Sequence, residues 1–210
     1  MQTIRNIIFD LGGVILNLDN QRTRDAFVAM GVKGFDNLFG HGHAASFFRD
    51  YELGAISDAQ FVSNLKELAG ISVEDAVVIG GWNAMLLDFP PQRMELLRSL
   101  AKRYRLFLFS NTNALHLAAL QQIYQSQFKG PALDAHFEKA YYSHLMGLRK
   151  PDLESFQMII EENGLVPSET LFVDDALINV EGARAAGLIG FHLRAPMSLL
   201  DVPWDDLDAV

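Results

Sequence analysis

Three short apolar runs, far apart in the sequence, each end abruptly in a polar residue that can bind an anion or a cation. The first run leads to Asp10, the second to Ser110 and the third to the pair Asp174 and Asp175. Short apolar runs bounded by polar turns are typical of buried strands. Parallel strands present their carboxyl ends at one edge of an open sheet, where ligands bind. We therefore expect three acids and a hydroxyl group to converge at this edge.

Strands and helices alternate through most of the chain, which favours a doubly wound, Rossmann-like α/β core around a parallel sheet. Apolar residues at helical spacing predict helices through Met94 to Leu100, through Leu117 to Ile123, from Pro151 with Leu153, Phe156 and Ile159 facing inward, and through Val180 to Ala186. Further short strands are predicted at Lys139 to Ser143 and at Ile189 to Leu193.

The alternation is interrupted once, between residues 20 and 88, by a segment whose pattern is helical. Ser57 to Gln60 has the form of a capping box at the start of one such helix. We interpret residues 19–89 as a helical-bundle cap domain, inserted into a core domain of residues 1–18 and 90–210. This placement allows the cap to cover the carboxyl edge of the sheet.

Composition excludes several classes of function. The net charge of -9 opposes binding along a nucleic-acid backbone or on an anionic membrane, so a small ligand is favoured. The chain has no cysteine, which excludes disulfides, thiolate metal sites and a cysteine nucleophile. No signal-peptide pattern and no apolar stretch of membrane-spanning length is present, and we expect a soluble, cytoplasmic protein. The sequence carries no indication of the oligomeric state.

Two glycines directly after Asp10 indicate that this residue does more than form a turn. An Asp at the end of a strand is commonly a helix cap or a turn former. Gly12 and Gly13 let the backbone turn tightly and approach a ligand closely, with amide groups free to donate to an anion. The pattern therefore favours a ligand site at this strand end.

The adjacent acids Asp174 and Asp175 point to a cation. Two carboxylates at a buried strand end repel each other and raise each other's pKa unless a cation lies between them. A hard divalent ion bound through oxygen ligands accounts for such a pair. Asn179, four residues beyond Asp175, is placed to hold a ligating water or to fix a loop.

Two further segments offer groups to an anion. Ser110 to Thr112 is expected to cap the next helix, and a helix start also presents unpaired amides and positive potential to a phosphate. The segment from Arg149 to Asp152 is expected to begin a helix, with Pro151 suited to the first turn. A lysine at such a place is usually solvated. Opposite the carboxylates, however, the Lys150 ammonium would neutralise phosphate oxygens and aspartates together.

Other polar residues are weaker candidates. Asn17 and Asp19 lie where the chain crosses into the cap and are candidates for hinge or leaving-group contacts. Glu52 and Trp82 are candidates to face a substrate, although a tryptophan here is more often part of a helix-bundle core. Arg149, beside Lys150, is a further candidate of this rank.

Two more polar patterns are interpreted as parts of the chain that bind no ligand. His41 and His43 have the spacing of a metal pair, but no third ligand is recognisable and we interpret them as loop residues. The aspartates near the C-terminus are expected to form a solvated acidic end: Asp201, Asp205, Asp206 and Asp208.

Four of these patterns, in this order, resemble the four motifs of the haloacid dehalogenase-like hydrolases. They are IIFDLGGV, which contains Asp10, LFLFSNT, which contains Ser110, GLRKPD, which contains Lys150, and LFVDDALIN, which contains Asp174. The insertion directly after the first motif resembles the helical cap of subfamily I, the family's first cap class. FDLGGVILNLD, YELGAISDAQF and GWNAML are further similar to bacterial sugar-phosphate phosphatases of the alpha-D-glucose-1-phosphate type.

This resemblance implies a Mg²⁺-dependent phosphatase that acts on a small phosphorylated metabolite. In the reaction that the resemblance implies, Asp10 attacks phosphorus in line and forms an aspartyl-phosphate, which water then hydrolyses. The ligands that the resemblance implies for Mg²⁺ are oxygens of Asp10, Gly12 and Asp175, with Asp174 as a further or outer ligand. The groups that it implies for binding phosphate belong to Gly12, Gly13, Ser110, Asn111 and Lys150.

One position departs from the family's pattern. The usual phosphatases of this family have a second Asp two residues after the nucleophile, which protonates the leaving oxygen and later activates water. Here that position is Gly12. Loss of a positioned general acid costs about 10²–10⁴ in rate, so the chain needs another proton source or a good leaving group, or has little activity. An anomeric sugar phosphate, which has an easier leaving group than an alkyl phosphate, fits this substitution.

Three other functions remain open at the level of sequence. The first is hydrolysis of a different small phosphate ester, because specificity in this fold lies in the cap. The second is dehalogenation by Asp10 without a metal, or phosphonate cleavage. Asp174 and Asp175 oppose the former, and no cap lysine in a recognisable context supports the latter. The third is a non-catalytic module that binds a phosphate ligand or a protein partner.

Overall fold

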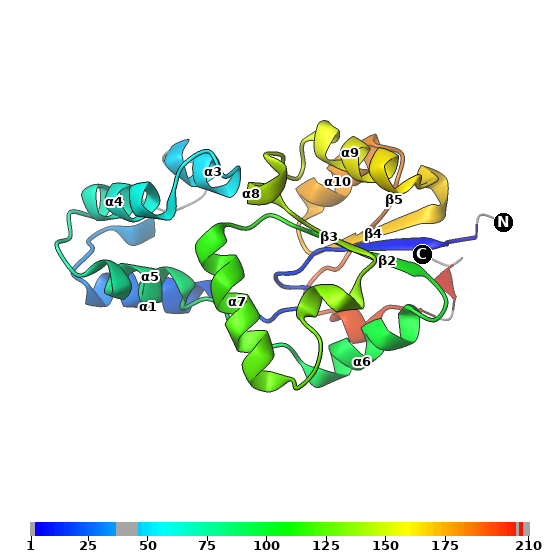
Figure 1. Ribbon diagram of the computed structural model, residues 1–210, viewed down its shortest axis with the longest axis horizontal. Coiled ribbons are helices and arrows are strands. Elements are labelled where there is room, and N and C mark those ends of the chain that lie inside the picture. The colour runs from blue at the N-terminus through cyan, green and yellow to red at the C-terminus, as the bar shows by residue number, and fades with distance from the viewer. Residues whose placement is uncertain (1–2, 37–45, 205, 208–210) are drawn as a thin grey trace.

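Five parallel strands form the sheet in the computed structural model, which describes residues 3–36, 46–204, 206 and 207. The strands are β1 (Asn6–Phe9), β2 (Arg105–Ser110), β3 (Lys139–Tyr142), β4 (Thr170–Asp174) and β5 (Ile189–His192). Their order is β3-β2-β1-β4-β5, so β1 lies at the centre between the strands that end in Ser110 and Asp174 (Figure 1). The predicted doubly wound α/β fold is confirmed.

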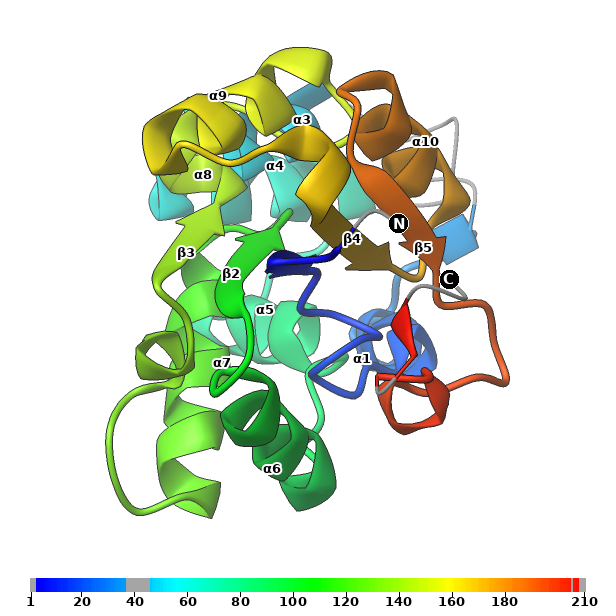
Figure 2. The same ribbon diagram turned by 90° about the vertical axis from the view of Figure 1, so that its right-hand side faces the viewer.

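Helices cover both faces of the sheet, because alternate residues of its buried strands point to opposite sides. Ile7 and Phe9 pack toward α6 (Pro91–Leu100) and α7 (Ala114–Gln127), whereas Ile8 packs toward α9 (Leu153–Asn163) and α10 (Leu177–Ala185). All three side chains are fully buried. Figure 2 shows these helix pairs on opposite sides of the strands. The same part of the chain also contains the short helix α8 (Ser143–Met146) and the 3-10 helices η1 (Leu133–His136), η2 (Pro167–Glu169) and η3 (Leu199–Asp201).

The helix after Lys150 begins later than the sequence predicts. Pro151 is expected in its first turn, but α9 starts at Leu153 and its N-cap is Asp152, whose backbone is still non-helical. The expectation that Leu153 faces inward is also wrong: this first residue of α9 is 40% exposed. Phe156 is fully buried, as predicted.

The C-terminal segment packs against the core between its acidic residues. Asp201 and Asp206 are exposed, as expected for an acidic end. Val202 and Trp204, however, belong to the hydrophobic cluster on the α6 side of the sheet. The Trp204 ring lies 5.8 Å from the ring of Phe9. The segment therefore completes the core on this face, which the sequence interpretation missed.

Helices between residues 20 and 83 form a second body beyond the carboxyl edge of the sheet (Figure 1). Their apolar side chains build a cluster of their own, with Phe27, Tyr51 and Phe61 at its centre. The predicted capping box is present at Ser57 to Gln60. We call this body the cap; its described helices are α1 (Asn20–Ala29), α3 (Ser46–Glu52), α4 (Asp58–Ala69) and α5 (Asp75–Asn83). Along the described part of the chain, no helix combines the length and apolar character needed to cross a membrane.

The two segments that cross between the cap and the sheet lie side by side. Asn17 donates to Asp88 twice, from its amide to the carbonyl at 2.9 Å and from Nδ2 to Oδ1 at 3.1 Å. Leu18 and Leu86 form an antiparallel bridge next to this pair. Arg93 of α6 also donates to Asn17 Oδ1 at 3.0 Å. These contacts fix the chain crossing close to the end of β1.

Candidate active site

Carboxylates of three residues meet at the carboxyl ends of β1 and β4. Asp10 follows β1, Asp174 ends β4 and Asp175 comes next. The Asp10 amide donates to the Val173 carbonyl at 2.9 Å, which keeps the two strands in register up to the acids. One oxygen of each acid lies within 4.8 Å of the others, and this is the only such cluster in the part of the chain that the structure describes.

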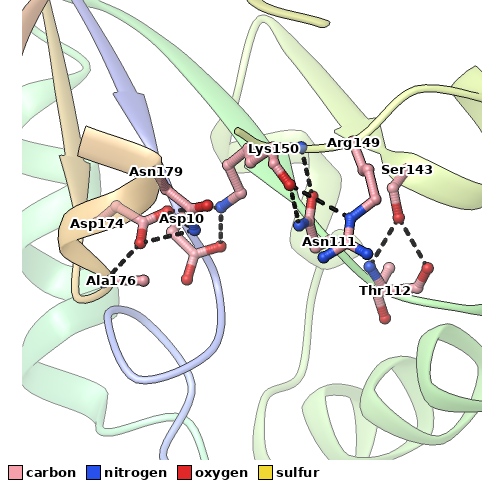
Figure 3. Close-up of polar contacts among 9 residues, drawn as sticks. All are labelled: Asp10, Asn111, Thr112, Ser143, Arg149, Lys150, Asp174, Ala176 and Asn179. Atoms are coloured by element: carbon pink, nitrogen blue, oxygen red, sulfur yellow. Dashed lines mark hydrogen bonds and ion pairs between the residues drawn. The ribbon is translucent and has the colours of Figure 1, made fainter. Parts of the chain in front are cut away.

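Lys150 lies between two of these acids. Its Nζ donates to Asp10 Oδ1 at 2.5 Å and to Asp174 Oδ2 at 2.7 Å (Figure 3). The lysine side chain is only 1% exposed, so the solvated position that is usual for a lysine does not apply here. Two carboxylates within hydrogen-bond distance compensate the burial of the ammonium.

Burial and mutual repulsion shift the pKa values of the cluster. Burial raises the pKa of Asp10 to about 7, although Lys150 opposes this shift. Burial and the charge of Asp174 also raise the pKa of Asp175. Burial disfavours the Lys150 ammonium, but its two carboxylate partners outweigh this and raise its pKa. The acids therefore repel one another in spite of Lys150, and additional positive charge at the site would relieve this.

Asp174 and Asp175 differ in their surroundings. Asp174 is fully buried, and both of its oxygens accept hydrogen bonds. The donors are Lys150, the Ala176 amide at 2.8 Å and Asn179 Nδ2, which lies 3.1 Å from each oxygen. Asp175 is exposed. Asp174 thus accepts hydrogen bonds from three neighbouring residues, and Asn179 helps to hold its carboxylate in place.

Gly13 makes room for the Asp175 carboxylate. Its φ of +77° lies in the region that favours glycine. A β-carbon at Gly13 would collide with Asp175 Oδ2. Both the backbone conformation and the close approach therefore require glycine at this position.

Asn111 holds Lys150 in place through backbone contacts. Its Nδ2 donates to the Lys150 carbonyl at 2.9 Å, and the Lys150 amide donates to Asn111 Oδ1 at 2.9 Å. The expectation that Ser110 to Thr112 caps the next helix is wrong, because α7 begins at Ala114 and its N-cap is Asn113. The Asn111 side chain forms its hydrogen bonds with the Lys150 backbone instead, and the chain stays non-helical as far as Asn113.

Ser143 is a contributor that the sequence interpretation missed. Its Oγ accepts from the Thr112 amide and donates to the Thr112 carbonyl, both at 2.9 Å (Figure 3). This double contact ties the loop after β2 to the end of β3. No local sequence signal marks Ser143, because the contact joins segments that are distant in the chain.

A cavity of about 180 Å³ opens beside Asp10 and Lys150. Of the residues predicted for the site, the following line it: Asp10, Gly12, Ser110, Asn111, Lys150 and Asn179. Further lining residues were not predicted: Leu11, Leu16, Leu18, Met85, Leu86, Thr112, His116 and Leu120. The predicted residues therefore supply most of the polar part of the wall, and the missed ones are mainly apolar, with Thr112 and His116 as the polar exceptions.

His116 joins this cavity to the cap. Its Nε2 lies 3.2 Å from the Trp82 carbonyl and its Nδ1 lies 3.3 Å from Asn113 Nδ2. Since the carbonyl only accepts and the Asn113 amide group donates, Nε2 carries the proton. Burial lowers the pKa of His116 to about 4. The Trp82 ring stacks on the imidazole at 4.9 Å and packs into the cap cluster, so Trp82 lies outside the cavity wall.

The remaining weaker candidates lie around the site without lining it. Glu52 of the cap pairs with Arg149 at 3.0 Å, which adds an ion pair between cap and core. Burial raises the pKa of Glu52 against the effect of Arg149. Asp19 caps α1 by accepting from the Gln21 amide, so a structural contact accounts for it. Four positions discussed above lie outside the described residues: His41, His43, Asp205 and Asp208.

Comparisons with known proteins agree with this geometry. A family model described as haloacid dehalogenase-like hydrolase matches residues 4–187. A D-ribitol-5-phosphate phosphatase of Bacteroides thetaiotaomicron is 30% identical over 190 residues, which cover 90% of this chain and 91% of the relative.

Solved structures of related proteins have the same fold. One is a haloacid dehalogenase family enzyme of Bacteroides thetaiotaomicron in complex with magnesium and inorganic phosphate. Its TM-score is 0.81 at 32% identity, covering 92% of this chain and 96% of that one. Another is a hydrolase of the same kind from Porphyromonas gingivalis, with a TM-score of 0.80 at 33% identity, covering 90% and 91% of the two chains.

Proposed function

Because the chain belongs to the haloacid dehalogenase-like hydrolases, we propose that it is a Mg²⁺-dependent phosphatase of a small sugar phosphate. The reaction would proceed through an aspartyl-phosphate on Asp10. The observation that supports this most is the position of Lys150, which is buried between Asp10 and Asp174 beside the cavity. A buried cation next to a candidate nucleophile at the open edge of a parallel sheet is suited to binding a transferring phosphoryl group.

The donor set fits magnesium. Mg²⁺ takes oxygen ligands and is usually bound through one or two carboxylates together with waters and substrate phosphate. We assign Asp10, the Gly12 carbonyl and the exposed Asp175 as its ligands, with Asp174 outside them because its oxygens already accept from Lys150 and other donors. When bound, the ion would offset negative charge on the phosphoryl group.

Four polar residues of the wall then have a defined task. Oδ1 of Asp10 accepts from Lys150, so we assign Oδ2 as the atom that attacks phosphorus. The Ser110 hydroxyl and the Asn111 backbone amide would donate to the phosphoryl oxygens. Lys150 would orient Asp10 and attract the phosphate at the same time. Water then attacks the aspartyl-phosphate and restores the carboxylate.

Three observations support the substrate proposal. A related enzyme of Bacteroides thetaiotaomicron is named for D-ribitol 5-phosphate, and a solved relative from that organism is in complex with magnesium and inorganic phosphate. Several segments of the chain also resemble the glucose-1-phosphate type of phosphatase. A cavity of about 180 Å³ suits a small metabolite rather than a polymer. The three clustered carboxylates oppose metal-free dehalogenation on the same fold.

Release of inorganic phosphate tests the proposal. Purified protein is given a panel of small phosphate esters, including glucose 1-phosphate and ribitol 5-phosphate, with Mg²⁺ or with a chelator. We expect metal-dependent turnover that Asp10→Asn abolishes, whereas the same change at the exposed Asp206 leaves it intact. Magnesium binding without turnover on any ester would contradict a phosphatase and favour a module that binds phosphate ligands.

A further inference from the structure

The end of cap helix α3 and the turn after it pack against the core beside α8 (Figure 1). A β-carbon added at Gly54, whose φ is +68°, would collide with the His144 carbonyl oxygen of α8. The Tyr51 hydroxyl accepts from the amide of Leu115 in α7 at 3.2 Å. Cap and core therefore meet closely here, and the packing of α3 determines where its last residue, Glu52, lies.

Glu52 reaches the segment that carries Lys150. Its Oε2 atom is buried and lies 3.0 Å from Arg149 Nη1, and the side chains of Glu52 and Arg149 are 33% and 29% exposed. Salt screens a partly buried ion pair of this kind less than it screens a pair on the surface. Glu52 is not part of the cavity wall, so contact with a substrate does not account for its position.

Arg149 connects this ion pair to Lys150. While Nη1 faces Glu52, Nε of the same guanidinium donates to the Lys150 carbonyl at 3.3 Å (Figure 3). The same carbonyl accepts from Asn111 Nδ2 at 2.9 Å. Because a guanidinium is planar and rigid, the position of one of its nitrogens fixes the others. Glu52 is thus two contacts away from the backbone of the residue whose ammonium lies between two acids of the site.

A second ion pair between α3 and the core lacks this connection. Arg49, three residues before Glu52, pairs with Asp152 at 3.5 Å. Asp152 is the N-cap of α9. In the described part of the chain, neither of these two side chains hydrogen-bonds to Lys150. This pair therefore ties the cap to the core without contacting the lysine, and it offers a matched control.

We propose that Glu52 is a positioning residue, which holds Lys150 in place through Arg149 when the cap is packed on the core. This inference deepens the proposed function and rests on it. Lys150 would be held from two sides, by Asn111 from the loop after β2 and by Glu52 from the cap. Phosphoryl transfer would be fastest with a packed cap, because Glu52 lies beside Arg149 only when α3 packs on the core.

Steady-state kinetics with saturating Mg²⁺ and two good ester substrates tests this role. Glu52→Gln keeps the shape of the side chain but removes its charge, and KM should stay nearly unchanged. We expect kcat to fall about 10-fold, less than the 10²-fold that a displaced catalytic group can cost, because Asn111 still holds Lys150. The fall should be equal for both esters, since Lys150 acts on the phosphoryl group that they share. Arg49→Gln, which breaks the other pair, should leave kcat unchanged.

A double variant shows whether Glu52 acts through Arg149. Arg149→Lys keeps the positive charge but offers one nitrogen in place of the two that contact Glu52 and Lys150, so kcat should fall similarly. Adding Glu52→Gln to Arg149→Lys should cost little more, because residues linked by contacts are not additive. Additive losses, an equal loss in Arg49→Gln, or a change confined to KM would overturn the positioning role and leave a phosphatase in place.

Folding of each variant is checked by circular dichroism. If Glu52→Gln does not fold, Arg149→Lys tests the same connection from the core side, and a folded Arg149→Lys with the kcat of the wild type would overturn the inference. No turnover by the wild type on any ester would instead contradict the proposed function, and the inference with it.

Discussion

Asn111 and Lys150 hold each other through two hydrogen bonds of 2.9 Å, one in each direction between the Asn111 side chain and the Lys150 backbone. The loop after β2 thereby fixes the residue that places an ammonium on Asp10. Both bonds involve groups distant in the sequence, and Ser143 ties the next residue of the same loop to β3. The position of Lys150 is thus determined by contacts with the loop after β2, which is distant from it in the sequence.

Asn111→Ala should therefore lower activity by misplacing Lys150. We expect kcat/KM to fall about 10²-fold, mainly through kcat, since a displacement of about 1 Å can cost that much. Steady-state kinetics on the best ester measures the split between kcat and KM. Asn20→Ala, at an exposed position of the cap, is the matched control. A change confined to KM would argue that Asn111 binds substrate and does not position Lys150.

Gly13→Ala should weaken magnesium binding beyond its effect on stability. Gly70 is a matched control, because its φ of +64° imposes a similar backbone penalty but nothing lies within 4 Å of an added β-carbon. Each variant should lose about 1 kcal/mol of unfolding free energy. Only Gly13→Ala crowds the Asp175 carboxylate, so only this variant should lose affinity for Mg²⁺ in calorimetric titration. Equal affinities in both variants would remove Asp175 from the proposed ligands.

Binding of Mg²⁺ should release a proton near neutral pH. In the metal-free protein the pKa of Asp10 is raised to about 7 by burial, so the carboxyl group is partly protonated below that pH. A metal ligand must be deprotonated, and the apparent affinity should therefore rise as the pH increases toward and through 7. Titration calorimetry in buffers of different ionisation enthalpy counts the proton. Asp10→Asn should abolish this release, and an affinity that is independent of pH in the wild type would contradict the assignment.

His116 should make the folded state less stable in mild acid. Its pKa is lowered by burial from 6.5 to about 4, so the unfolded chain binds the extra proton between these values and stability falls as the pH decreases through that window. His116→Phe keeps a ring on Trp82 but removes the titration. Between pH 7.5 and pH 5 the unfolding free energy of the wild type should fall by about 2 kcal/mol more than that of the variant. Urea denaturation at both pH values measures this difference, and an equal fall in both proteins would refute it.

The fold and the polar half of the site were predictable because their signals are local. Apolar runs that end in Asp10, Ser110 and Asp174 identify buried strands, and parallel strands bring their ends together whatever lies between them. The capping box at Ser57 is likewise complete within a few residues. Such features need no knowledge of distant partners.

What the sequence did not reveal depends on contacts between distant segments. Ser110 to Thr112 carries a plausible cap signal, but Asn111 bonds to Lys150 and Thr112 to Ser143, so α7 starts later. Tertiary contacts of this kind override local propensity, and only the structure shows them.

Direct detection of a phosphoryl group on Asp10 tests the central claim. The enzyme is mixed with Mg²⁺ and its best ester and quenched in acid within one turnover. Borohydride reduction, which converts an aspartyl-phosphate to homoserine, is followed by peptide mass spectrometry. We predict homoserine at position 10 in the wild type and none in Asp10→Asn or without substrate. Rapid release of phosphate with unmodified Asp10 at every quench time would contradict the account, because water would then attack the substrate directly.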